Sequence, residues 1–139
     1  MNGAWTWHCD RVFRSDPHVG REILDEVLEH LVVNHWDEQE VFGVHLAMEE
    51  ALSNALKHGN GGDRSKHVRI RCCMSSDKVE IEITDEGRGF DPSAIPDPTA
   101  PENIHKPGGR GVKLMQSYMS DVRFNASGNQ VLLEKVRHQ

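Results

Sequence analysis

Three polar residues at helical spacing are the first candidates for chemistry in this 139-residue chain: Glu50, Asn54 and Lys57. On a helix turning about 100° per residue they fall within roughly 60° of one another, on the side opposite the apolar stripe. An amide oxygen such as that of Asn54 suits Mg²⁺, which takes few protein ligands and completes its shell with water and phosphates. Lys57 is placed to meet a phosphate, and Glu50 to accept a proton from a hydroxyl group. Taken alone, the same residues would equally fit an ordinary solvent-exposed helix face.

A second candidate segment runs from Asp85 to Phe90 and directly follows a strand with period-two alternation. Asp85 continues the parity of the apolar strand residues, so we expect its side chain to point toward the helix-covered face of the sheet. A buried carboxylate at that position needs a partner. A calcium loop is the rival interpretation, but its third and fifth positions would be Gly87 and Gly89, which have no side-chain oxygen, and this argues against an EF-hand.

The third segment, Gly108-Gly109-Arg110-Gly111, lies at the expected start of a helix. Bare backbone N–H groups at a helix N-terminus are suited to cradle phosphates. A glycine-rich hinge is the alternative, and the segment is neither a Walker A sequence nor a dinucleotide-binding fingerprint. It therefore gains meaning only from following the other two segments in order.

Apolar periodicity locates the elements that must position these segments. We expect a strand over residues 5–13, a helix that Asp16 caps and that ends near Asn34, and a second helix from Asp37 to Gly59. Period-two alternation and turn residues then predict two strands, a helix and two more strands, at 68–74, 79–83, 112–119, 122–126 and 130–136.

The stretch over residues 91–107 has a different composition, because five of the six prolines fall there and apolar periodicity vanishes. A loop of this length is uncommon inside a compact domain unless it works as a lid or a binding loop. We therefore expect a lid over residues 91–107.

The order strand, two helices, two strands, lid, helix, two strands predicts one α+β domain over residues 1–139. The expected architecture is a two-layer α/β sandwich, with a mostly antiparallel, mixed sheet covered by helices on one face. On its other face we expect cross-strand charge pairs, with Arg69 and Arg71 opposite Glu80 and Glu82.

Composition limits the partners. The net charge is −6 and the Lys and Arg residues are scattered, which argues against nucleic acid or an anionic membrane and favours a protein or a small ligand. No segment reads as a signal peptide or a membrane span, so we expect a cytoplasmic protein. The three cysteines, Cys9, Cys72 and Cys73, have neither disulfide nor zinc-site spacing and are expected to be reduced packing residues.

The order and spacing of the three polar segments resemble the N, G1 and G2 boxes of the GHKL ATPase superfamily, and most closely its small anti-sigma-factor serine kinases. The stretches EALSNALKHGN from Glu50 and KLMQSYMSDV from Lys113 are similar to theirs. The resemblance implies that the chain binds ATP with Mg²⁺, that Glu50 is the catalytic base and that Asn54 binds the metal.

The same resemblance implies that Asp85 accepts a hydrogen bond from the adenine amino group, which guanine could not donate. Gly87 and Gly89 would then let the backbone approach the base. The other residues that the resemblance places at the nucleotide are Lys57, His58, Phe90, Lys106, Gly108, Gly109, Arg110 and Gly111.

The implied function is that of a serine/threonine protein kinase which phosphorylates a STAS-type antagonist, binds a sigma factor, or both, and which dimerises in some members. One position departs from the family, because Pro107 stands where sporulation-type kinases carry a lid arginine. Lys106 or Arg110 would have to substitute, although Arg and Lys do not grip phosphate alike. The alternative is a nucleotide-gated protein-binding module without kinase activity. A switch kinase in another signalling complex would share the chemistry and differ in its partner.

Overall fold

The computed structural model of the chain describes residues 5–87 and 109–137, apart from the side chains of residues 109 and 110. The helices and strands follow the predicted order. They are β1 (Trp7–Arg14), α1 (Pro17–Val33), α2 (Glu38–Ser53), the π-helical η1 (Asn54–Gly59), β2 (His67–Met74), β3 (Lys78–Asp85), α3 (Gly109–Tyr118), β4 (Asp121–Phe124) and β5 (Gln130–Val136).

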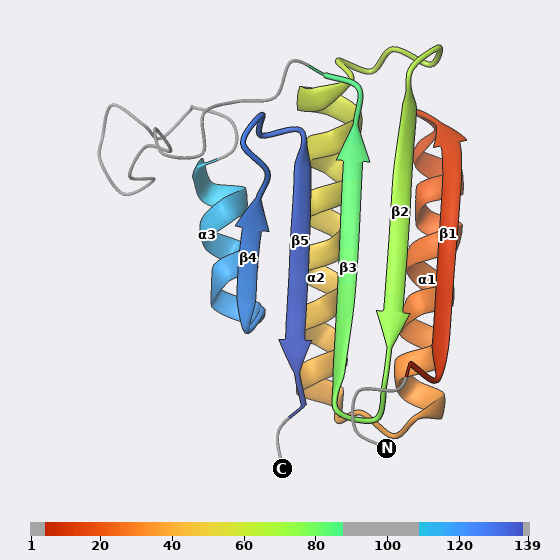
Figure 1. Ribbon diagram of the computed structural model, residues 1–139, viewed down its shortest axis with the longest axis vertical. Coiled ribbons are helices and arrows are strands. Elements are labelled where there is room, and N and C mark those ends of the chain that lie inside the picture. Colours follow the sequence, from red (N-terminus) through yellow and green to blue (C-terminus); the bar gives the residue numbers. More distant parts are fainter. Residues whose placement is uncertain (1–4, 88–108, 138–139) are drawn as a thin grey trace.

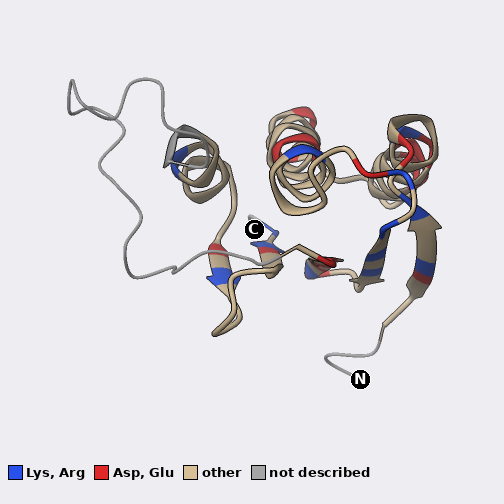
Figure 2. Ribbon diagram, turned by 90° about the horizontal axis from the view of Figure 1, so that it is seen from above, with Lys and Arg blue, Asp and Glu red and all other residues tan. Residues whose placement is uncertain are grey.

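The five strands form one sheet in the order β1-β2-β3-β5-β4. The three long helices lie together on one face of this sheet, as the two layers in Figures 1 and 2 show. This arrangement confirms the predicted α+β sandwich. Each of the four pairings between the described strands is antiparallel, so this sheet is not mixed.

Both N-terminal helices begin at the predicted caps. The Asp16 carboxylate accepts a hydrogen bond from His18 N at 2.9 Å, and the Asp37 carboxylate accepts one from Glu40 N at 2.7 Å. Each bond satisfies a backbone donor that has no partner within the helix. Asn34 closes α1 with a bond from its amide to the His30 carbonyl at 2.7 Å.

The core lies between the helices and the alternate strand residues that face them. Cys9 and Cys72 belong to it as opposed residues of β1 and β2, and burial raises the pKa of both thiols. Cys73 follows Cys72 on β2, so its side chain points to the other face of the sheet and is partly exposed. The largest fully buried side chains are Leu24, Leu31, Met48, Ile70, Met74, Ile81, Ile83, Met115 and Leu133.

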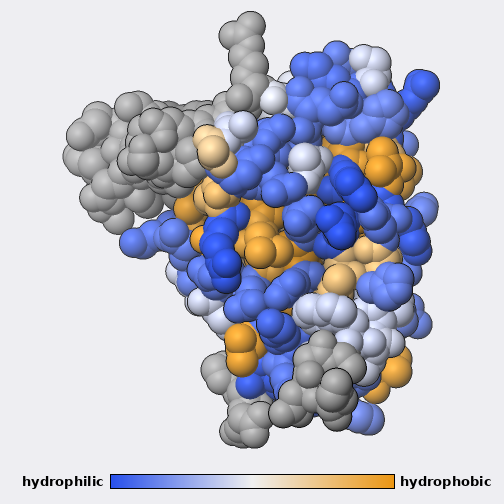
Figure 3. All heavy atoms as spheres, in the orientation of Figure 1, coloured by the Kyte–Doolittle hydropathy of each residue, from blue (hydrophilic) through white to orange (hydrophobic). Residues whose placement is uncertain are grey.

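The opposite face of the sheet is mostly hydrophilic, with small apolar patches between the charges (Figure 3). Arg71 pairs with Glu82 across β2 and β3 at 3.8 Å, as predicted. The predicted pairing of Arg69 is wrong. The register places Thr84 opposite Arg69 on β3, and the guanidinium instead bonds Asp10 of β1 at 2.7 Å.

The predicted lid over residues 91–107 lies outside the described residues and stays a prediction. Within the described part of the chain, no helix is both long enough and apolar enough to cross a membrane.

Candidate functional site

The three polar segments come together at one end of the sandwich. In Figure 1 this is the upper end, where η1 follows α2, β3 finishes and α3 begins. Two contacts join the segments: Asp85 meets Gly59, and Glu50 meets Gly111. Segments that are up to 61 positions apart in the chain, from Glu50 to Gly111, therefore build one site.

The helix that carries the first segment does not stay α-helical. Regular α2 ends at Ser53, and residues 54–59 form the wider π turn η1, in which Asn60 N bonds Ala55 O at 2.8 Å. The prediction of one α-helix up to Gly59 is thus wrong at its end. Because a π turn holds more residues than an α turn, the row of Glu50, Asn54 and Lys57 does not continue past Asn54 as predicted. Single π turns occur often at functional sites.

Asp85 lies on the helix-covered side of the sheet, as its parity predicted. Its Oδ1 accepts a hydrogen bond from Gly87 N at 2.7 Å. A side chain at Gly59 would overlap the Asp85 carboxylate, and one at Gly87 would overlap the backbone of Gly59. The end of η1 and the chain after β3 therefore approach so closely that only glycine fits at positions 59 and 87.

Burial raises the pKa of the Asp85 carboxyl, while the Gly87 N–H bond and the positive charge of Lys66 act in the opposite direction. Desolvation is the largest of these effects, so the carboxylate lacks enough protein partners to replace water. A carboxyl with a perturbed pKa is a typical feature of a functional site.

Glu50 lies against the first turn of α3. A side chain at Gly111 would overlap its carboxylate, so the two residues are in direct contact. Helix α3 begins at Gly109, earlier than the predicted start at residue 112, and residues 109–111 form its first turn. The backbone N–H groups of a first turn have no partner within the helix and attract anions.

Asn54 is half-buried, and its side-chain amide makes no hydrogen bond within the part of the chain that the structure describes. Its oxygen is a hard donor of the kind that Mg²⁺ takes. Lys57 and His58 are both exposed on η1. The chemistry of these residues is compatible with an ATP site, and Asn54 offers an oxygen of the type that Mg²⁺ accepts.

Several predicted residues cannot be placed in this site. Gly89, Phe90, Lys106 and Gly108 lie outside the described residues, and for Arg110 only the backbone is described.

Two asparagines around Asp85 were missed by the sequence analysis. Asn60 is 2% exposed and bonds Glu86 N, while the Asn129 amide bonds the Asp85 carbonyl. The only signal was their position, Asn60 directly after the helix-ending Gly59 and Asn129 in a turn between strands.

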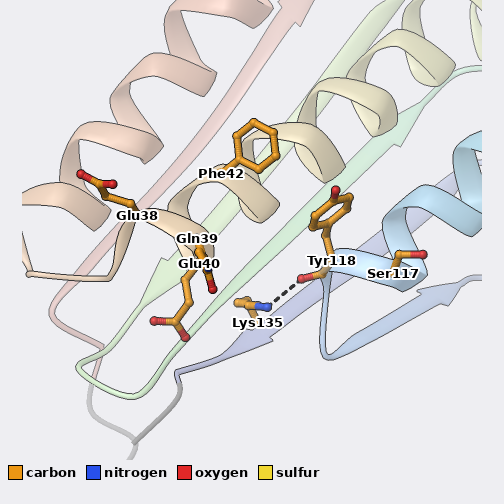
Figure 4. Close-up of a pocket in the computed structure, with 7 residues that line it drawn as sticks. All are labelled: Glu38, Gln39, Glu40, Phe42, Ser117, Tyr118 and Lys135. Carbon is orange, nitrogen blue, oxygen red and sulfur yellow. Dashed lines mark hydrogen bonds between the residues drawn. The ribbon is translucent and has the colours of Figure 1, made fainter.

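A hollow of about 620 Å³ lies at the other end of α2, away from the three segments (Figure 4). Sixteen residues of helix separate Glu38 from Asn54, which is roughly 24 Å along the axis at 1.5 Å per residue. In this hollow Lys135 Nζ donates to the Tyr118 carbonyl at 2.8 Å and so satisfies the C-terminal end of α3. The hollow lined by Phe42 and Tyr118 is therefore separate from the site of the three segments.

Comparison with known proteins identifies the family of the chain. The family model of the histidine kinase-like ATPase domain matches residues 13–135. The fold, the glycines at the site and the order of the three polar segments define a nucleotide-binding ATPase domain of the GHKL class. The chain belongs to the histidine kinase-like ATPase family.

The curated relatives are protein kinases. Serine-protein kinase RsbW of Oceanobacillus iheyensis is 33% identical over 86 residues, which cover 58% of this chain and 54% of that protein. RsbW of Bacillus subtilis is 31% identical over 103 residues, with 69% and 64% covered. Serine/threonine-protein kinase BtrW of Bordetella bronchiseptica is 26% identical over 100 residues, with 70% of each chain covered. The match to the first of these relatives spans about half of its length.

A solved structure shares the fold. The crystal structure of the RsbU and RsbW domains of Rv1364c from Mycobacterium tuberculosis superposes with a TM-score of 0.63, covering 96% of this chain and 32% of that one. At 14% sequence identity this likeness concerns the fold alone.

We predict that Gly87→Ala destabilises the protein by about 1–3 kcal/mol or more, because the new methyl group meets the backbone of Gly59, which no side-chain rotation can move away. The matched control is Gly20→Ala in α1, where the added Cβ comes no closer than 3.7 Å to any neighbour. That change should be neutral or stabilising by up to about 1 kcal/mol, because alanine favours the helix. Urea unfolding of both variants tests the prediction, and equal stabilities would contradict the close approach.

A second prediction concerns pH. Since the pKa of Asp85 is raised in the folded state, the folded protein binds this proton more tightly than the unfolded chain, whose carboxyl titrates at about 3.9. The Asp85 contribution therefore lowers stability as pH rises from about 4 through the folded pKa. Asp85→Asn removes this effect and keeps an acceptor for Gly87 N, so its stability relative to wild type should grow from pH 4.5 to 8. Thermal unfolding of both proteins without nucleotide measures this, and a stability difference that stays constant across this pH range would contradict the prediction.

Proposed function

We propose that the protein is an ATP-dependent serine/threonine protein kinase that acts in sigma-factor regulation. The observation that supports this most is the meeting of the three segments: Asp85 against Gly59 and Gly87, and Glu50 against Gly111. In this proposal Asp85 is the selective acceptor for the base, and Glu50 is the carboxylate that lies beside the first turn of α3.

In this proposal Asp85 accepts a hydrogen bond from the adenine amino group, and the backbone of Gly59 and Gly87 lies against the base. The first turn of α3 receives the phosphates, because its free N–H groups and the helix dipole favour anions. Asn54 would hold Mg²⁺ through its amide oxygen, and the metal would supply neutralisation of the phosphate charge.

Glu50 acts as the base that receives the proton of a serine hydroxyl on the protein substrate. The serine oxygen bonds the γ-phosphorus, the bond from that phosphorus to the bridging oxygen breaks, and ADP leaves. Positioning and charge neutralisation supply most of the catalysis in such transfers. Glu50 lies beside the helix end that would hold the phosphates, where a base must be.

The protein substrate that we propose is a STAS-type antagonist, with a sigma factor as a second partner and a homodimer as the working assembly. Support comes from relatives whose names are serine-protein kinase RsbW. A nucleotide-gated binding module without transfer is the second candidate. The observation in its favour is that Pro107 stands where the sporulation-type kinases, which this sequence resembles, carry a lid arginine.

We predict that Asn54→Ala weakens ATP binding only when Mg²⁺ is present. Because the amide acts through the metal, wild type and variant should bind ATP alike in EDTA, and the difference should appear on adding Mg²⁺. Isothermal titration calorimetry measures both conditions. Asn34→Ala, which removes an asparagine amide at the other end of the fold, is the control that should bind as wild type. A wild-type protein that releases no binding heat with Mg-ATP would overturn the proposed function.

We also predict that Glu50→Gln leaves the ATP affinity within about threefold of wild type and lowers phosphoryl transfer by roughly 10²–10⁴-fold, the usual contribution of a general base. The assay is incorporation of labelled phosphate into the STAS protein. Glu49→Gln is the matched control, since its neighbouring carboxylate is exposed and pairs with Arg21 at 3.2 Å. Equal phosphorylation by the Glu50 variant would exclude Glu50 as the base. Nucleotide-dependent binding of an unmodified partner to wild type would favour the gated module.

A further inference from the structure

Asn60 is a buried amide that ties three chain segments together at the site. Its Nδ2 donates to Ser15 Oγ at 2.8 Å and to the His67 carbonyl at 3.0 Å, and its Oδ1 accepts from Glu86 N at 2.8 Å. The end of β1, the start of β2 and the chain after β3 are thereby joined. Both donors and the acceptor of this amide have partners, so its orientation is fixed.

The bond from Glu86 N bears directly on Asp85. This N–H belongs to the peptide that leaves Asp85, so Asn60 fixes the plane of that peptide. Asn129 holds both peptides of Asp85: its carbonyl accepts from Asp85 N at 2.9 Å, and its Nδ2 donates at 3.2 Å to the Asp85 carbonyl, on the same 85–86 peptide that Asn60 holds. The backbone of Asp85 is held from both directions.

A fixed backbone fixes the carboxylate. The Asp85 side chain has only two torsions, and one of its oxygens is occupied by Gly87 N. Hydrogen-bond strength falls steeply as the angle departs from linearity. A rotation of the 85–86 peptide would therefore turn the carboxylate away from a ligand that it bonds, although Asn60 itself is buried and bonded within the protein.

We propose that Asn60 is a positioning residue for nucleobase specificity, because it holds the peptide after Asp85 and so aims the carboxylate at the exocyclic amino group of a 6-aminopurine. This inference rests on the proposed nucleotide-binding function and adds a residue to it. The requirement is for an amide, with an acceptor for Glu86 N and donors for Ser15 and the His67 carbonyl on one short side chain.

The test compares two ligands on the same protein. The dissociation constants of ATP and of purine riboside triphosphate, which lacks the 6-amino group, are measured by calorimetry for each variant. Wild type should prefer ATP by about tenfold or more, the value of a hydrogen bond to a charged acceptor. Asn60→Ala should reduce this preference to within about threefold. A loss of stability alone would weaken the binding of both ligands and leave the ratio of their dissociation constants unchanged.

Ser15→Ala is the matched control. It removes one partner of the same amide but leaves the bond from Asn60 to Glu86 N, so it should keep the wild-type ratio even where its melting temperature falls. Should Asn60→Ala not fold, Asn60→Ser carries the same prediction, because its hydroxyl is one atom too short for Glu86 N.

The outcomes separate the two proposals. A wild-type preference that persists in the Asn60 variant would overturn the positioning role and leave the ATP site intact. A wild-type protein that binds neither ligand would overturn the site itself and this inference with it. An equal loss of preference in the Ser15 variant would also count against Asn60, since it would assign the effect to the whole network.

Discussion

The close approach of two backbones, at Gly59 and Gly87, is the constraint on which the site depends. A methyl group on either residue has no space, and the Asp85 carboxylate lies in the same narrow region. The helix must therefore end at β3 in a conformation that presents bare backbone, and the wide turn η1 provides it. Because the approach joins the end of a helix to the end of a strand, it also sets the distance between the two layers at this end of the sheet.

The site carries a cost in stability that the rest of the fold offsets. Asp85 is desolvated enough to have a raised pKa, and it has no ion pair at hydrogen-bonding distance among the described residues. A core of fully buried aliphatic residues lies behind it, in the middle of the sheet, where strand alternation and helix stripes agree. The hydrogen bonds of Asn60 and Asn129 then hold the 85–86 peptide that follows the Asp85 side chain. Sites that bind ligands commonly give up stability in this way.

The sequence predicted what local signals determine. The caps Asp16 and Asp37 and the parity of Asp85 depend on a few neighbouring residues, and the structure has all three as expected. The predicted end of the second helix was wrong, because apolar spacing alone does not distinguish a final π turn from an α turn. Arg69 was paired with the wrong strand, because its partner Asp10 lies 59 positions away and register across such a distance has no local signal. Asn60 was missed for the same reason, since its partners come from three separate segments.

Helix α2 connects the chemistry of the site to the rest of the helical layer. Glu50 touches the first turn of α3, and at the other end Gly43 lets Tyr118 pack so closely that an added Cβ would lie 3.2 Å from its ring. At the C-terminal end of α3, Lys135 of β5 donates a hydrogen bond to the Tyr118 carbonyl. Helix α3 is therefore held at both of its ends. In the proposed function the phosphates meet the first turn of α3, so the contact of this turn with Glu50 would link the phosphate site to the proposed base.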